Sequence, residues 1–273
     1  DRIALVGNTL FERAAHFGYF EAVAQTYFPK HKLQFRNLAW SADTPDLQPR
    51  PANFADLTQH LTYEKIDIII AAYGFNESFA GRVGAEKFHQ DLSKHVSSLK
   101  TKAFNGTSGP RIVLVSPIAN ENIQNVPAAD RNNAQIKDYV QVIEQVAKEQ
   151  QVAFVDLFSP TLAAMTDPDS DLTINGCHLN DLGYQHLSQI LFRKLFQQQA
   201  PQYAPAVVEA IRDKNRQYLR RFRPLNTFYY TGGRNKSYGY LDFLPAMRNF
   251  EVLVDNREHR IWDIVGGKDV PAK

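Results

Sequence analysis

The chain has 273 residues, of which 44% are hydrophobic and 22% are charged, as in ordinary globular proteins. Its 31 Lys and Arg residues nearly balance 29 Asp and Glu residues, so no overall field draws it to nucleic acid. No stretch approaches the roughly 18 apolar residues that a membrane-spanning helix needs. Cys177 is the single cysteine, which excludes an intrachain disulfide.

Short β-branched runs alternate with longer helical stretches through the first 200 residues, the pattern of a parallel sheet covered on both faces. In chain order we expect a strand at Arg2–Val6, a helix at Phe11–Tyr27, a strand at Lys32–Leu38, a helix at Asn53–Thr62, a strand at Ile66–Ala72, a helix at Ala85–Lys100, a strand at Arg111–Ser116, a helix at Arg131–Gln150, a strand at Val152–Leu157 and a helix at Asp181–Gln199. Asn180 or Asp181 is well placed to cap the last helix. The sequence therefore predicts a three-layer α/β/α, flavodoxin-like fold with a five-stranded parallel sheet.

The character of the sequence changes after Pro201. Val207–Phe222 and Leu241–Val265 have the apolar spacing of helices, and a glycine- and tyrosine-rich loop lies between them. We expect a domain at residues 1–200 and an extension at residues 201–273 that packs on it, because two helices bury little core alone. The basic residues crowded between positions 212 and 223 are interpreted as a solvated helix face with salt bridges, and an anionic ligand is the alternative.

Polar residues follow the expected strands at the carboxyl edge of the sheet, where ligands of open parallel sheets bind. Thr9 follows the first strand, Ala39 and Trp40 the second, and Asn76 the third, while His178 precedes the helix expected at residue 181. Acyl transfer needs a hydroxyl nucleophile, a histidine that takes its proton, and donors aimed at the developing oxyanion. These strand ends offer groups of all three kinds.

The order and spacing of these segments resemble the four blocks of the SGNH/GDSL hydrolase superfamily across residues 1–200. Members of that superfamily place Gly-Asp-Ser after the first strand, a glycine after the second, Gly-x-Asn-Asp after the third and Asp-x-x-His near the end. The resemblance puts Thr9 at the nucleophile, His178 at the base and Asn175 at the acid. It puts Asn76, Ala39 and the N–H of Thr9 at the oxyanion hole. The implied activity is an esterase-type hydrolase that acts on an O-acylated, for example acetylated, carbohydrate.

Three positions depart from the pattern of the superfamily. Thr9 adds a methyl group and a stiff χ1 to the nucleophile. Asn175 replaces the aspartate that orients the base, and loss of such a carboxylate in a serine protease triad costs about 10⁴ in kcat. Ala39 replaces a glycine but keeps its N–H. A non-catalytic carbohydrate-binding protein that kept the fold is therefore the competing interpretation.

The local sequence around these blocks resembles that of a divergent GDSL-like subfamily found mainly in planctomycetes and related polysaccharide-degrading bacteria. The resemblance implies a glycan-derived small-molecule or oligosaccharide substrate and a secreted or periplasmic setting. Asn8, Glu12, Trp40 and Glu77 are expected to be polar or aromatic substrate contacts beside the site.

Two further interpretations concern the acids and the extension. Glu12 and Glu77 fall near the same strand ends, so a glycosidase-like carboxylate pair is a third function if they lie about 5 to 10 Å apart. The simpler interpretation is that they are helix first-turn acids that complement the helix dipole. Gly232-Gly233 marks a turn that could bring Arg234 and Asn235 over the cleft as sugar contacts, whereas the tyrosines of the extension are more simply explained as packing residues.

Metal binding is not expected, because no His and Cys spacing matches a zinc site, and no cofactor is expected either. The remaining histidines are interpreted as structural or exposed: His16, His31, His60, His89, His95, His186 and His259.

Overall fold

The computed structural model describes residues 1–51, 54–123, 128–167, 169–224 and 239–270. Its centre is a parallel sheet with strand order β2-β1-β3-β4-β5, so the predicted fold class is confirmed. The strands are β1 (Arg2–Gly7), β2 (Gln34–Asn37), β3 (Ile68–Ala72), β4 (Arg111–Val115) and β5 (Ala153–Val155). Apolar residues line both faces of the central strands, since a parallel sheet is buried between two helical layers.

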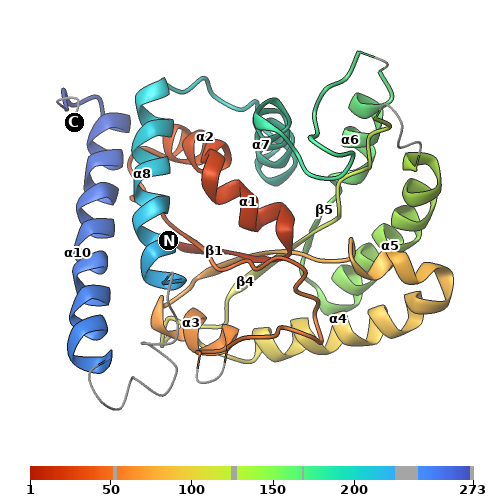
Figure 1. The fold of residues 1–273 in the computed structure, drawn as a ribbon, viewed down its shortest axis with the longest axis horizontal. Helices are drawn as coiled ribbons and strands as arrows, with labels where there is room; N and C mark the ends of the chain where they lie inside the picture. Colours follow the sequence, from red (N-terminus) through yellow and green to blue (C-terminus); the bar gives the residue numbers. More distant parts are fainter. Residues whose placement is uncertain (52–53, 124–127, 168, 225–238, 271–273) are drawn as a thin grey trace.

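Helices cover both faces of the sheet (Figure 1). They are α1 (Thr9–Phe17), α2 (Tyr19–Tyr27), α3 (Leu57–Tyr63), the 3₁₀ helix η1 (Glu77–Gly84), α4 (Ala85–Lys100), α5 (Ala129–Gln150), α6 (Phe158–Met165), α7 (Asp181–Phe196), α8 (Pro205–Phe222) and α10 (Gly239–Val265). One core packs α1, α2, α6 and α7 against the sheet, and the other packs α3, α4 and most of the buried face of α5. Asn180 caps α7 through a bond from the N–H of Gly183, as predicted. None of the helices in these ranges is long and apolar enough to span a bilayer.

The helix predicted at Phe11–Tyr27 is two helices, because the chain turns at Gly18. Gly18 has φ 73° and ends α1 by donating its N–H to the Ala14 carbonyl, a conformation that glycine adopts without strain. A Cβ at this position would lie 2.8 Å from Cγ2 of Ile211. The turn thus lets α8 pack closely against the break between α1 and α2.

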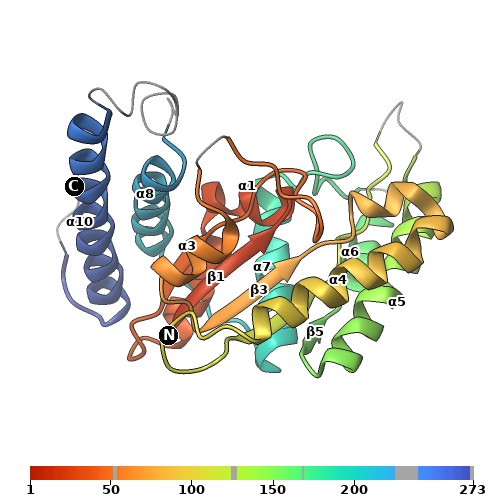
Figure 2. The ribbon, with the colours of Figure 1, turned by 90° about the horizontal axis from the view of Figure 1, so that it is seen from below.

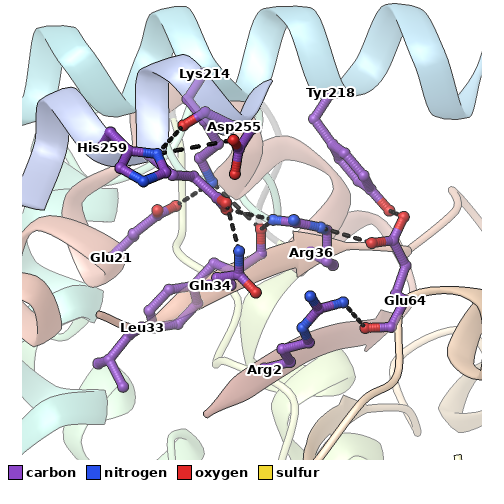
Figure 3. A network of polar contacts seen from close by, with 12 residues as sticks. Arg2, Glu21, Leu33, Gln34, Arg36, Glu64, Lys214, Tyr218, Asp255 and His259 are labelled. Carbon is purple, nitrogen blue, oxygen red and sulfur yellow. Dashed lines mark hydrogen bonds and ion pairs between the residues drawn. The ribbon is translucent and has the colours of Figure 1, made fainter. Parts of the chain in front are cut away.

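The two C-terminal helices lie side by side next to the β2 edge of the sheet (Figures 1 and 2). Buried ion pairs hold them there (Figure 3). Arg36 of β2 contacts Glu64 at 2.7 Å and Glu258 of α10 at 2.5 Å, and Lys214 of α8 contacts Glu21 of α2 at 2.8 Å. Lys214 is 0% exposed, so the predicted solvated face is wrong for this residue: the salt bridges form, but inside the protein.

Candidate active site

A pocket of about 160 Å³ opens at the carboxyl ends of β1 and β3. The strand order reverses between these two strands, and ligands of open parallel sheets bind at such a switch point. The pocket is lined by Asn8, Thr9, Leu10, Ala72, Tyr73, Phe75, Asn76, Pro117, Ile118, Cys177, His178, Leu179 and Tyr184. The fold therefore brings Thr9, Asn76 and His178, which are far apart in the sequence, onto one cavity.

Thr9 is held at the pocket by a tight connection between β1 and α1. Gly7 has φ 110°, and a Cβ there would lie 2.0 Å from the carbonyl oxygen of Ala72, so a glycine is needed for this approach of β1 to β3. Asn8 donates its N–H to that carbonyl at 3.2 Å, and its side chain caps α1 by accepting the N–H of Leu10. Thr9 is consequently the first residue of α1, where backbone N–H groups have no partner within the helix.

Asn76 supplies a second polar group to the pocket, directly after β3. Its Nδ2 is buried and has no hydrogen-bond acceptor among the residues that the structure describes. An unpaired buried donor costs about 1–3 kcal/mol, so an oxygen of a bound ligand would gain a ready partner. The neighbouring Glu77 faces inward: its Oε2 accepts the N–H of Gly74 at 2.9 Å, and burial raises its pKa to about 7.

His178 lies in a short antiparallel turn before α7, where Thr173 pairs with Leu179. Asn175 Oδ1 accepts the backbone N–H of His178 at 2.9 Å, and both side-chain amide atoms of Asn175 are close to His178 Nδ1, with Nδ2 at 2.9 Å and Oδ1 at 3.1 Å. Burial, followed by the nearby Arg13 guanidinium, lowers the pKa of His178. The lowered pKa favours the neutral imidazole, the form that a general base needs.

Glu121 organises the turn that carries Asn175 and His178, and the sequence interpretation missed it. Its buried carboxylate accepts bonds from Ser170 Oγ at 2.7 Å and from the N–H groups of residues 172 and 173. Its own N–H donates to the carbonyl of Gly176 at 2.8 Å. The available signal was its position in the loop after the fourth strand, a strand end that the motif analysis did not use.

Two predicted site residues after β2 lie away from the pocket. Ala39 is 2% exposed and donates its N–H to Asn37 Oδ1 at 3.2 Å, so the predicted oxyanion donor is already engaged. The ring of Trp40 is stacked on Phe54 and carries two guanidinium groups, Arg50 at 4.5 Å and Arg223 at 4.1 Å. These neighbours occupy the aromatic surface that a sugar would use.

The two acids of the glycosidase hypothesis do not meet at the pocket. Glu12 is paired with Arg223 at 2.6 Å and accepts a bond from Ser41. Glu77 is turned toward the backbone of Gly74, and neither acid lines the cavity. The structure thus gives the carboxylate pair no shared space for a substrate. Arg234 and Asn235 lie outside the described residues.

Comparisons with known proteins agree with this fold. The family model described as "GDSL-like Lipase/Acylhydrolase family" matches residues 7–186, whereas a search of curated proteins found no match. Similar solved structures include an acetylxylan esterase variant from Geobacillus stearothermophilus, with 14% identity and a TM-score of 0.54 over 74% of this chain and 97% of that one. An aryl esterase from M. smegmatis has 17% identity and a TM-score of 0.53 over 72% and 99%. A gut microbial diltiazem-metabolizing enzyme has 17% identity and a TM-score of 0.55 over 71% of this chain, but the match spans only 46% of that protein. At these identities the structures support the fold.

Proposed function

The chain belongs to the GDSL-like lipase/acylhydrolase family of the SGNH superfamily, and from this membership we propose that it is an esterase that removes short acyl groups from carbohydrate. The observation that carries the proposal is the pocket shared by Thr9, Asn76 and His178. Its volume of about 160 Å³ is below the roughly 300–1,000 Å³ of sites that enclose drug-sized ligands. An acetyl group fits this space, while the sugar that carries it would remain outside.

The reaction would begin when Nε2 of His178 takes the hydroxyl proton of Thr9 and Thr9 Oγ1 attacks the ester carbonyl. The Asn76 amide and the N–H of Thr9 would donate to the oxyanion that forms. His178 would then return the proton to the departing sugar oxygen, leaving an acyl group on Thr9. Water activated by His178 would hydrolyse this intermediate and release acetate.

A non-catalytic carbohydrate-binding protein is the second candidate, and two residues favour it. Thr9 brings a methyl group to the position of attack, and Asn175 offers His178 a neutral amide in place of a carboxylate. The pocket with its unpaired Asn76 amide would then recognise the acyl oxygen without cleaving the ester. A secreted or periplasmic setting in a polysaccharide-degrading bacterium suits both candidates and stays a prediction.

Hydrolysis of an aryl acetate and of acetylated xylooligosaccharides by the intact protein tests the proposal. We expect Thr9→Ser to raise kcat, because serine presents the same oxygen without the methyl group, and Thr9→Ala to abolish hydrolysis. Thr107→Ser, at an exposed turn, is the matched control and should change nothing.

Two outcomes would contradict the esterase. If Thr9→Ala hydrolyses as fast as the unmodified protein, Thr9 is not the nucleophile. If neither the unmodified protein nor Thr9→Ser hydrolyses any ester but calorimetry detects oligosaccharide binding, the carbohydrate-binding protein is correct.

A further inference from the structure

A second cavity, of about 510 Å³, lies at the opposite end of the sheet from the candidate active site. Its sheet wall is built from residues near the amino ends of the strands, among them Ile3, Ile68 and Val113. No residue lines both this cavity and the pocket of the candidate active site. The two cavities are therefore separate.

The helices around this cavity leave part of the sheet uncovered. Phe20 and Ala24 of α2 and Leu195 and Phe196 of α7 form its other wall. Ile68 and Val113 are only half-buried although their strands are central, and Phe196 is 38% exposed. The cavity thus presents apolar surface to solvent. Its volume lies within the roughly 300–1,000 Å³ of small-molecule sites.

The charged groups of the lining are both cationic. Lys100, Arg111 and Gln151 are the only polar side chains in it, and no carboxylate lines the cavity among the described residues. Lys100 Nζ donates to the neutral carbonyl of Gln150. Arg111 pairs with Asp1 at 2.8 Å, but both side chains are largely exposed, and water weakens such surface pairs. Both cations can therefore pair with an anionic ligand.

We propose that this cavity binds a free straight-chain alkyl carboxylate. The chain would lie along Ile68, Val113 and the aromatic wall of α2 and α7, where its methylene groups leave water. The carboxylate would stay at the rim beside Lys100 and Arg111, where it needs no burial of charge. This proposal is independent of the esterase, because it uses none of the residues at the carboxyl end of the sheet.

Calorimetric titration of the intact protein with octanoate, decanoate and dodecanoate tests the apolar part. Each buried methylene is expected to lower Kd about fourfold, so dodecanoate should bind far more tightly than octanoate. Equal Kd values for the three acids, or no heat of binding with any of them, would overturn the proposal.

Two sets of variants test the location. Lys100→Gln with Arg111→Gln should weaken dodecanoate at least tenfold and leave dodecanol unchanged. Arg82→Gln is the matched control, since Arg82 is also an exposed arginine paired with an aspartate, but does not line the cavity. Val113→Phe, and separately Ile68→Phe, should fill the cavity and abolish binding. Thermal unfolding identifies any variant that fails to fold.

Binding that is unchanged in both filled variants would place the ligand elsewhere and refute the proposal. Concentration-dependent dimerisation that blocks dodecanoate would assign the apolar surface to a second copy of the chain, and would refute it equally.

Discussion

The substitution Asn175→Asp tests how the proposed base is held. Asn175 Oδ1 accepts the backbone N–H of His178, while Nδ2 and Oδ1 lie 2.9 and 3.1 Å from His178 Nδ1. If Nδ2 donates to Nδ1, the ring proton sits on Nε2, which then cannot take a proton from Thr9. If Nδ1–H donates to Oδ1, Nε2 is free to act. The amide allows both arrangements, and a carboxylate allows only the second.

The expected gain follows from this tautomer. Replacing the aspartate of a serine protease triad by asparagine costs about 10⁴ in kcat, chiefly through the wrong tautomer. His178 is partly exposed to solvent, so water screens the charge of the new carboxylate. The rise in kcat should therefore be smaller than the roughly 10⁴-fold loss seen when such a carboxylate is removed. In the Thr9→Ser background we expect Asn175→Asp to raise kcat by about 10² to 10³, which corresponds to about 2.7–4.1 kcal/mol.

Two measurements check this expectation. Hydrolysis of an aryl acetate gives kcat, and ¹⁵N chemical shifts of the His178 ring report which nitrogen carries the proton. We expect the proton on Nδ1 in the aspartate variant and a mixture in the unmodified chain. Asn180→Asp, at the cap of α7, is the control. If the tautomer moves to Nδ1 but kcat stays constant, His178 is not the base.

Three further variants test the surroundings of the site and of α8. Arg13→Gln should move the acidic limb of the pH–rate profile to higher pH, because Arg13 adds to burial in lowering the pKa of His178 and the base works only when neutral; an unmoved limb would contradict this. Glu121→Gln should cost about 2–4 kcal/mol in urea unfolding at pH 7, since one amide oxygen replaces two acceptors. Burial raises the pKa of Glu121, but the hydrogen bonds that its carboxylate accepts have the larger combined effect and lower the pKa. The loss of stability in Glu121→Gln should therefore vanish as the pH falls through this lowered pKa, where the unmodified carboxylate is protonated as well. A loss of stability that persists in acid would refute the role of the charge. Lys214→Met should cost about 3–5 kcal/mol by leaving Glu21 buried and unpaired, and adding Glu21→Leu should restore most of it; a persistent loss in the double variant would show that packing dominates.

The sequence predicts the fold because the sheet is specified locally. The runs at Ile66–Ala72 and Ile112–Val115 are apolar on both faces, and the structure places β3 and β4 there. The break at Gly18 was missed because it rests on a positive φ of 73° at this one residue, and the helical spacing of apolar residues continues on both sides of it. The short helix α6 was missed because Pro160 lies inside it, and proline in a short segment favours a turn.

The site was predictable where it depends on strand ends, and less so where it depends on hydrogen bonds. Thr9, Asn76 and His178 share a pocket because β1 and β3 are neighbours, a relation that follows from the fold class. Ala39 was expected to donate to an oxyanion, but the side chain of Asn37 takes its N–H. Such a bond depends on a rotamer, which no sequence pattern specifies.

The residues that hold the pocket together are not those that would perform the chemistry. Gly7 allows β1 to approach β3, Asn8 caps α1, and Glu121 fastens the turn of His178. None of these contacts involves the Thr9 hydroxyl or requires a carboxylate at residue 175. The contacts that build the pocket therefore do not depend on which residues stand at positions 9 and 175, and introducing Ser and Asp there should act on kcat far more than on stability. A loss of folding in the double variant would show instead that Thr9 and Asn175 are part of the scaffold.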